Sequence, residues 1–368
     1  MLFDKRIKSH FHWPLFWVTM TLILVGFINL YSATYTISEK GLSPLFKSQI
    51  VWFFVGMIVS FFLLLLDYRV LIRLAYPLYI FSLFLLILVL FFGKEISGNR
   101  NWLAVGPFNM QPSELAKTTF IIGMARFFSD HPSYSGYGFK KIFKPLVMLL
   151  FPLVLIVLSK DIGSSLFFVL SFVSLLLFRG LKKNVLIFCF ILGLVGSFGV
   201  YYKVLSSHQK LRISAYLHPE EDPKGRGYHL LQSKIAVGSG RIFGKGYLKG
   251  THNKLMYLPE RHTDFIFPVL AEEWGFVGSI FVLGLYMALL LYGVQVASKA
   301  GEGFGVFLAL GITALFFWHL VINLGGVLGL IPLTGVTLPL LSYGGSSMVM
   351  VLIGMSLLLN VSMRRFMF

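Results

Sequence analysis

Charged side chains are scarce in this chain. They make up 13% of its 368 residues, against about a quarter in an ordinary soluble domain. Acids are the scarcest, with 15 Asp and Glu beside 32 Lys and Arg, while 57% of the residues are hydrophobic. The mean hydropathy is +0.80. This composition excludes a typical water-soluble domain and predicts a polytopic membrane protein.

Other absences exclude several kinds of site. The single cysteine, Cys189, cannot form a disulfide within the chain and is expected to be a small lipid- or core-facing hydrophobe. The chain has no H-E-x-x-H motif and no local Cys/His spacing that would hold zinc. It also lacks the G-x-S-x-G nucleophile elbow, and the GSG at 238–240 lacks the strand-to-helix context of a phosphate loop.

Ten apolar windows are candidates for bilayer spans, since a core of about 30 Å needs roughly 20 helical residues. The first follows a basic start, but it is too long for a secretory signal core, so we expect a retained anchor. We predict an all-α polytopic integral membrane protein forming one domain over 1–368, with one long extracytoplasmic loop at 206–263. The windows lie near 14–34, 46–66, 74–92, 112–128, 145–159, 162–178, 184–205, 265–297, 304–328 and 338–362.

The distribution of basic residues predicts the orientation. An even number of spans places both termini on one side, and short cytoplasmic loops carry an excess of Lys and Arg. The side of the N-terminus holds fifteen basic residues: Lys5, Arg6, Lys8, Arg69, Arg73, Arg126, Lys140, Lys141, Lys144, Arg179, Lys182, Lys183, Lys299, Arg364 and Arg365. The opposite short loops hold five: Lys40, Lys47, Lys94, Arg100 and Lys160. Both termini are therefore expected in the cytoplasm.

The long loop carries ten basic and four acidic residues. This balance favours an anionic partner at the outer surface. A soluble basic patch with interleaved aromatics is absent, so no nucleic-acid partner is expected. Residues 218–229 have turn chemistry, and 230–240 are typical of a short interfacial helix that stops at glycine.

Ionisable groups inside spans are costly and therefore mark candidate sites. Glu114 and Lys117 share one helix face, either as a neutralised structural pair or as the wall of a polar cavity. Asp161 lies at a tight bend, where it could simply cap the next helix. Pro268 favours a helix start there and leaves Asp264 one turn outside it, at the outer interface. A helix-dipole role for Asp264 is the alternative, although Glu272 and Glu273 already supply negative charge there.

The tail NLGGVLGLIPLTGVTLPLLSYGGSS, residues 323–347, resembles the signature of the SEDS family, which includes RodA, FtsW and SpoVE. Its two prolines, Pro332 and Pro339, predict a non-helical segment that either lines a cavity or forms a packed turn. The resemblance continues through NLYSA, NRNWLAVGPFNMQPSELAK, KDIGSS and LPERHTDFIFPVLAEEWG, and the long loop is most similar to the RodA branch. The sequence departs from the family pattern at Asn101, Arg241 and Thr337.

The resemblance implies a peptidoglycan glycosyltransferase that polymerises lipid II in the bacterial cytoplasmic membrane. It implies two kinds of protein partner, a class B penicillin-binding protein and membrane proteins of the elongation machinery. Asp264, in the HTDF motif, is implied as the essential acid, and we expect it to act as general base in an inverting transfer. A divalent cation such as Mg²⁺ could bridge the pyrophosphate. The expected substrate-binding residues are Glu114, Lys117, Asp161, Arg212, Arg261, His262, Trp102 and Arg100.

Two other functions remain open at this point. A lipid II flippase would also use a polar path such as that of Glu114, Lys117 and Asp161, but it would place its critical groups near the middle of the bilayer. A non-catalytic scaffold for a penicillin-binding protein would tolerate substitution of Asp264.

Overall fold

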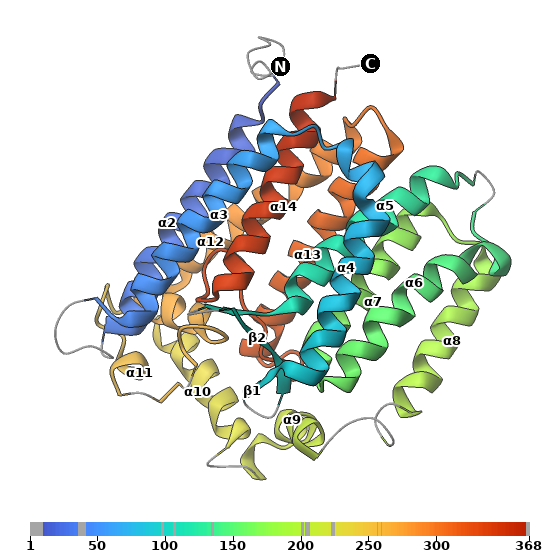
Figure 1. The fold of residues 1–368 in the computed structure, drawn as a ribbon. Coiled ribbons are helices and arrows are strands. Elements are labelled where there is room, and N and C mark those ends of the chain that lie inside the picture. The colour runs from blue at the N-terminus through green and yellow to red at the C-terminus, as the bar shows by residue number, and fades with distance from the viewer. Residues whose placement is uncertain are drawn as a thin grey trace.

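The computed structural model describes residues 10–35, 42–96, 99–105, 108–133, 136–199, 202, 207–221, 225–255, 257–258 and 260–365. In this part of the chain, ten long helices form one bundle (Figure 1). They are α2 (Trp13–Thr34), α3 (Pro44–Leu65), α4 (Val70–Phe92), α5 (Pro112–Asp130), α6 (Phe139–Leu158), α7 (Ile162–Arg179), α8 (Lys183–Gly199), α12 (Ile266–Ser298), α13 (Gly303–Val327) and α14 (Gly345–Arg364). Each of the ten predicted windows corresponds to one of these helices.

Eight helices of the described residues are long and apolar enough to cross a membrane, which confirms a multi-pass helical membrane protein. The other two are α5 and α8. Helix α8 has 17 residues. Helix α5 carries Glu114, Lys117, Arg126 and Asp130, yet most of its residues are buried among other helices. A helix enclosed by protein does not need an apolar surface all round, so its hydropathy can fall below that of a lipid-facing span.

Two predicted windows begin six or more residues away from the start of their helices. Helix α6 begins at Phe139, six residues before the window at 145, because hydropathy excludes the basic first turns that lie at the bundle end. Helix α14 begins at Gly345 rather than at 338, because the preceding residues form an irregular segment. The basic residues Lys5, Arg6, Lys8, Lys40 and Lys203, and part of the loop 206–263, lie outside the described residues.

Both chain ends lie at the same end of the bundle (Figure 1). There the Ser362 hydroxyl donates to the His10 carbonyl at 3.3 Å. The opposite end, called here the loop end, carries a small sheet and the short helices of the long loop: α9 (Ser207–Leu217), α10 (Arg226–Ser239) and α11 (Thr251–Lys254). The helix predicted at 230–240 is α10, and Gly240 follows its last residue as expected.

A three-stranded antiparallel sheet between α4 and α5 was not predicted. Its order is β1 (Lys94–Ile96), β2 (Asn99–Val105) and β3 (Phe108–Met110). Lys94 pairs with Trp102, and Leu103 pairs with Met110. Such short strands lack the length over which alternation can be recognised, so hydropathy gave no signal. The sheet fixes the entry of α5 and therefore the position of Glu114 and Lys117.

Helix α12 is broken at Gly275, whose φ is +67° and whose backbone is non-helical. The chain after α10 lies against this break and supplies the missing backbone donors and acceptors. Phe276 N donates to the Arg241 carbonyl at 2.8 Å, and Lys245 N donates to the Glu272 carbonyl at 3.0 Å. A Cβ on Gly244 would come within 2.1 Å of the Glu273 carbonyl oxygen, so this approach requires glycine. The first two turns of α12 are thereby fixed to the loop end.

Two buried carboxylates reinforce the same attachment. Glu272 Oε1 accepts from Lys245 Nζ at 2.6 Å and from Thr251 N and Oγ1 at 2.9 Å each. Glu273 Oε1 accepts from the Ser32 hydroxyl at 2.6 Å. These side chains accept hydrogen bonds from the loop and from α2. They therefore hold the three segments together, in addition to supplying the negative charge near the helix start that the sequence predicts.

Candidate active site

The segment between α13 and α14 forms the centre of the site. Residues 332–338 have no regular secondary structure, as the two prolines predict. The Asn323 amide donates to the Val336 carbonyl at 2.6 Å, and the Tyr286 hydroxyl donates to the Pro339 carbonyl. Non-helical backbone at the edge of a membrane bundle is tolerated where such partners satisfy it.

The loop that carries Asp264 is bonded to this segment. The Ser342 hydroxyl donates to the Thr263 carbonyl at 2.6 Å, and Tyr343 N donates to the His262 carbonyl at 2.8 Å. The amide of Asn323 also reaches the Asp264 carbonyl at 3.0 Å. Thus 260–265 and the SYGG block form one unit, although about 80 residues separate them in sequence.

Asp264 and Arg212 face each other over Gly335. A Cβ built on Gly335 would lie 3.4 Å from Asp264 Oδ2 and 3.9 Å from Arg212 Nη2. Arg212 belongs to α9, and its Nη1 donates to the Thr334 carbonyl at 2.8 Å. Gly335 is exposed and Asp264 partly exposed, so a carboxylate and a guanidinium flank an accessible strip of backbone. Asp264 does not cap α12, whose N-cap residue is Phe265, without a side-chain hydrogen bond.

The surroundings of Asp264 raise the pKa of its carboxyl group to about 6. Desolvation by the surrounding protein is the main cause, and the nearby Glu260 carboxylate adds to it. The Arg212 guanidinium opposes this shift. A carboxylate with such a pKa is a stronger base than an ordinary aspartate and is still mostly ionised at neutral pH.

Glu114 and Lys117 lie on the other side of the same segment. Lys117 Nζ contacts Glu114 Oε1 at 2.8 Å and His319 Nε2 at 3.1 Å. Because an ammonium group only donates, His319 Nε2 must accept, and the imidazole proton is on Nδ1, which donates to the Thr337 carbonyl at 3.4 Å. The imidazole stacks on Phe167, with ring centroids 4.0 Å apart. His319 therefore links the buried lysine to the central segment.

Asp161 caps α7, as one of its two predicted roles required. Its carboxylate accepts from Ser164 N at 3.1 Å and from Ser164 Oγ at 2.8 Å. It also accepts from the Asn101 amide at 3.0 Å and the Gln111 amide at 3.1 Å. This cluster joins the sheet, α5 and α7. Gly163, two residues after Asp161, packs on the Thr334 carbonyl. A Cβ built on Gly163 would lie 3.1 Å from that carbonyl oxygen.

The remaining predicted residues lie in the Asp264 loop and on β2, at the loop end. Arg261 is buried, and burial lowers the pKa of its guanidinium. His262 is half-buried with Nε2 3.6 Å from Glu260 Oε2, and burial lowers its pKa. Arg100 is exposed on β2 and reaches the Leu90 carbonyl of α4 at 3.5 Å, while Trp102 is half-buried on the same strand. Contact of any of these residues with substrate stays a prediction.

Sequence reasoning missed three residues that organise the site: His319, Gln111 and the side-chain role of Asn323. A signal was available for two of them, because a histidine and an asparagine stand within the apolar span 304–328, where polar groups are costly. Gln111 had no such signal, since it lies in a loop.

The sequence is similar to those of known proteins. The FtsW/RodA/SpoVE family profile, described as cell cycle protein, matches residues 13–366. The stage V sporulation protein E of Bacillus subtilis is 38% identical, with 94% of this chain and 95% of that protein covered. The peptidoglycan glycosyltransferase MrdB of Escherichia coli K12 is 36% identical, with 94% and 93% covered.

Solved structures have the same fold. A chain of a peptidoglycan synthase complex that coordinates polymerization and crosslinking superposes with a TM-score of 0.82 at 34% identity, covering 97% of this chain and 98% of that one. The rod shape determining protein RodA of Thermus thermophilus superposes with a TM-score of 0.72 at 32% identity and the same coverage. Sequence, fold and the SYGG segment together place this chain in the SEDS family of RodA, FtsW and SpoVE.

Proposed function

We propose that this chain is a peptidoglycan glycosyltransferase that polymerises lipid II into glycan strands for cell-wall elongation. The observation that carries the proposal is the placement of Asp264 and Arg212 around the exposed Gly335, at the loop end of the bundle. The names of the relatives support the same activity, since MrdB and the RodA of Treponema pallidum are peptidoglycan glycosyltransferases.

In the proposed reaction, Asp264 accepts the proton of the acceptor's 4-hydroxyl as that oxygen forms a bond to the anomeric carbon of the donor. The bond between this carbon and the pyrophosphate oxygen breaks, and in-line displacement inverts the anomeric centre. The leaving pyrophosphate is already stable as an anion, so no strong acid is needed to protonate it. One carboxylate can therefore suffice, and a general base typically contributes about 10² to 10⁴-fold.

The pyrophosphate requires cations, and Arg212 is the proposed first partner because its guanidinium lies across Gly335 from the base. Lys117, Arg261 and Arg100 are further candidates. Within the described residues, no group of three His, Cys, Asp or Glu side chains is placed to hold a metal. A cation such as Mg²⁺ would therefore be held mainly by substrate phosphates, as is common for this ion, and the proposal assigns it no step.

We place both termini in the cytoplasm and the site at the outer face of the bacterial cytoplasmic membrane, because the short loops at the terminal end carry more basic residues. The structural similarity to a peptidoglycan synthase complex supports a crosslinking partner. The proposed partner is a class B penicillin-binding protein, within a group of elongation membrane proteins.

The proposal is tested by giving lipid II only to the loop-end face of reconstituted vesicles. We expect glycan strands on that face, measured by gel separation of labelled product, with the proposed partner co-reconstituted in parallel. A flippase would instead transfer lipid II to the other leaflet and produce no polymer. Transfer without polymer, with or without the partner, would refute the proposal.

The pKa of Asp264 predicts the acidic limb of the pH–rate profile. The base must be ionised, so kcat/KM should fall about tenfold per pH unit below pH about 6. The limb should remain in His262→Gln, which removes the neighbouring imidazole, whose pKa is lowered by burial. A profile that is flat from pH 5 to 8 would contradict the assignment.

Loss of stability does not explain this limb. The folded-state pKa of Asp264 is raised, so between pH about 4 and about 6 the folded chain binds more protons at this carboxyl than the unfolded chain does. Acidification through that window therefore stabilises the fold at this position. Thermal unfolding measured at pH 5.5 and 7.5 separates the two effects.

A further inference from the structure

A lateral cleft opens between α4, α5 and α6, on the half of the bundle that carries the chain termini. Its volume is about 430 Å³, and its lining is almost entirely apolar. This volume lies within the usual range of ligand cavities, about 300 to 1,000 Å³. The proposed reaction makes no use of this cleft.

The deep end of the cleft is closed by a contact between α4 and α6. The Tyr79 hydroxyl donates to the Met148 carbonyl at 2.6 Å. Behind them, a Cβ on Gly123 of α5 would lie 3.3 Å from the Met148 methyl carbon, so the three helices are in close contact there. Ile80 of α4 and Phe127 of α5 form apolar walls of the cleft, and Ile80 is 63% exposed.

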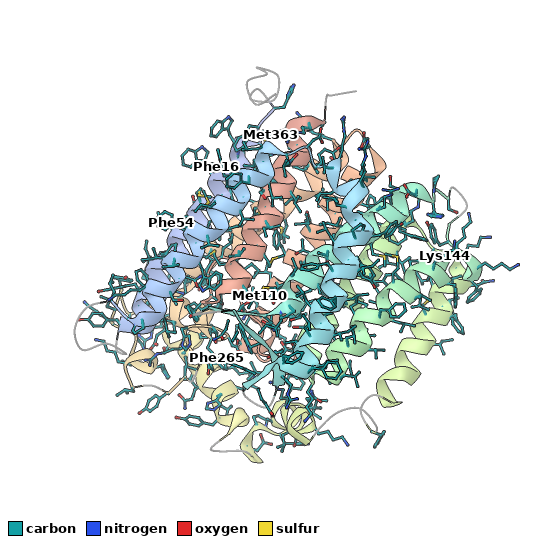
Figure 2. The ribbon with its side chains drawn as sticks, viewed as in Figure 1. Phe16, Phe54, Met110, Lys144, Phe265 and Met363 are labelled. Carbon is teal, nitrogen blue, oxygen red and sulfur yellow. The ribbon has the colours of Figure 1, made fainter. Side chains whose placement is uncertain are left out.

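The mouth of the cleft carries positive charge. Lys144 lines it from the second turn of α6 and is exposed; Figure 2 shows it at the periphery of the bundle. Lys140 and Lys141 precede it in the first turn of that helix. Asp130, the last residue of α5, is paired with Arg126 at 2.6 Å and so offsets little of this charge. His131 also lines the mouth, where its ring stacks on Phe127 at 4.5 Å.

The position of the mouth along the bundle fits a lipid headgroup. The α5 terminus contacts the α13 start, since a Cβ on Gly303 would lie 3.2 Å from the Ser129 hydroxyl. The mouth therefore lies at the same level as the ends of the neighbouring spans. A lysine there can keep its ammonium among headgroups while its stem lies along hydrocarbon.

We propose that this cleft is a binding site for one anionic phospholipid of the leaflet at the terminal end. An acyl chain lies against Tyr79, Ile80 and Met148, and the phosphate lies against the Lys144 ammonium. Basic pockets between spanning helices are suited to anionic headgroups. The bound chain fills a volume that would otherwise separate α6 from α4.

Native mass spectrometry of the purified full chain tests the site. Phosphatidylglycerol and phosphatidylcholine with identical acyl chains are added separately, so that only the headgroup differs. We expect at least about fivefold higher occupancy of the first retained lipid with phosphatidylglycerol, equal to about 1 kcal/mol. Lys144→Gln should remove this preference, and Ile80→Trp should lower retention of both lipids by filling the cleft.

Lys183→Gln is the matched control, because Lys183 is an exposed lysine at the same end of the bundle, at the start of α8, and does not line the cleft. It should leave the preference unchanged. Equal retention of the two lipids by the unmodified chain would mean nonselective lipid filling and would overturn the proposal. So would equal effects of the two lysine substitutions, or displacement of the retained lipid by an equimolar polyprenyl phosphate.

Discussion

Replacing Asp264 with asparagine is expected to reduce polymer synthesis from lipid II by about 10² to 10⁴-fold, the usual contribution of a positioned general base. The substitution keeps the size of the side chain and the backbone bond from Asn323 to the Asp264 carbonyl, which does not involve the carboxyl group. It removes the negative charge and with it the ability to accept the proton. The measurement is the initial rate of glycan formation with purified protein, with and without the proposed partner.

The fold should tolerate this change. The raised pKa means that the surrounding protein disfavours the ionised carboxyl group, so the neutral amide should unfold at the same temperature or higher. Ser165→Ala, at a buried hydroxyl that bonds within its own helix α7, gives a control with an intact site. Full polymerisation by Asp264→Asn would rule out Asp264 as the general base. If the partner alone made the product, this result would favour a non-catalytic scaffold role for the chain.

Gly335→Ala is expected to lower the rate by about tenfold or more while the chain remains folded. The φ of Gly335 is +74°, which disfavours any side chain by about 1 to 2 kcal/mol. In addition, the new methyl group would lie 3.4 Å from Asp264 Oδ2 and 4.0 Å from Arg212 Nη1, in the space where the substrate is proposed to bind. Displacement of a reacting group by about 1 Å can cost 100-fold.

Gly180→Ala is the control that separates backbone strain from obstruction of the substrate space. Gly180 has φ +91° at the end of α7, and no atom lies within 4 Å of its Cβ position. Both variants should lose similar stability in thermal unfolding, but only Gly335→Ala should lose activity. If the two variants had equal rates, the space over Gly335 would not be part of the substrate site.

The helices were predictable because each span must bury a long apolar segment in lipid. Windows such as 304–328 differ from the observed α13 by one residue at each end. The sheet at 94–110 and the break in α12 at Gly275 were not predictable in this way. The first consists of strands too short to show alternation, and the second depends on carbonyl groups of Arg241 and Ile242 that lie some 35 residues earlier in the chain.

The candidate site was also predictable only in part. Asp264, Glu114 and Lys117 drew attention because charged groups in or beside apolar segments are costly, while the role of Asp264 as base came from the family resemblance and stays a prediction. The partner of Asp264 was only one of several basic candidates, since ten cations share the long loop. Folding brings Arg212 of α9 to it across Gly335, and places His319 between Lys117 and Thr337.

The sequence by itself determined the membrane class, the long helices and the proline interruption between the last two spans, because these follow from the local cost of placing polar groups or proline in lipid or helix. The role of Asp264 came from the family resemblance and stays a prediction. The tertiary structure decided which cation faces the Asp264 carboxylate, how far its pKa is raised, and that Asp161 also bonds to Asn101 and Gln111. These properties depend on distances between segments far apart in the chain, and such distances are set by packing, which no local pattern encodes.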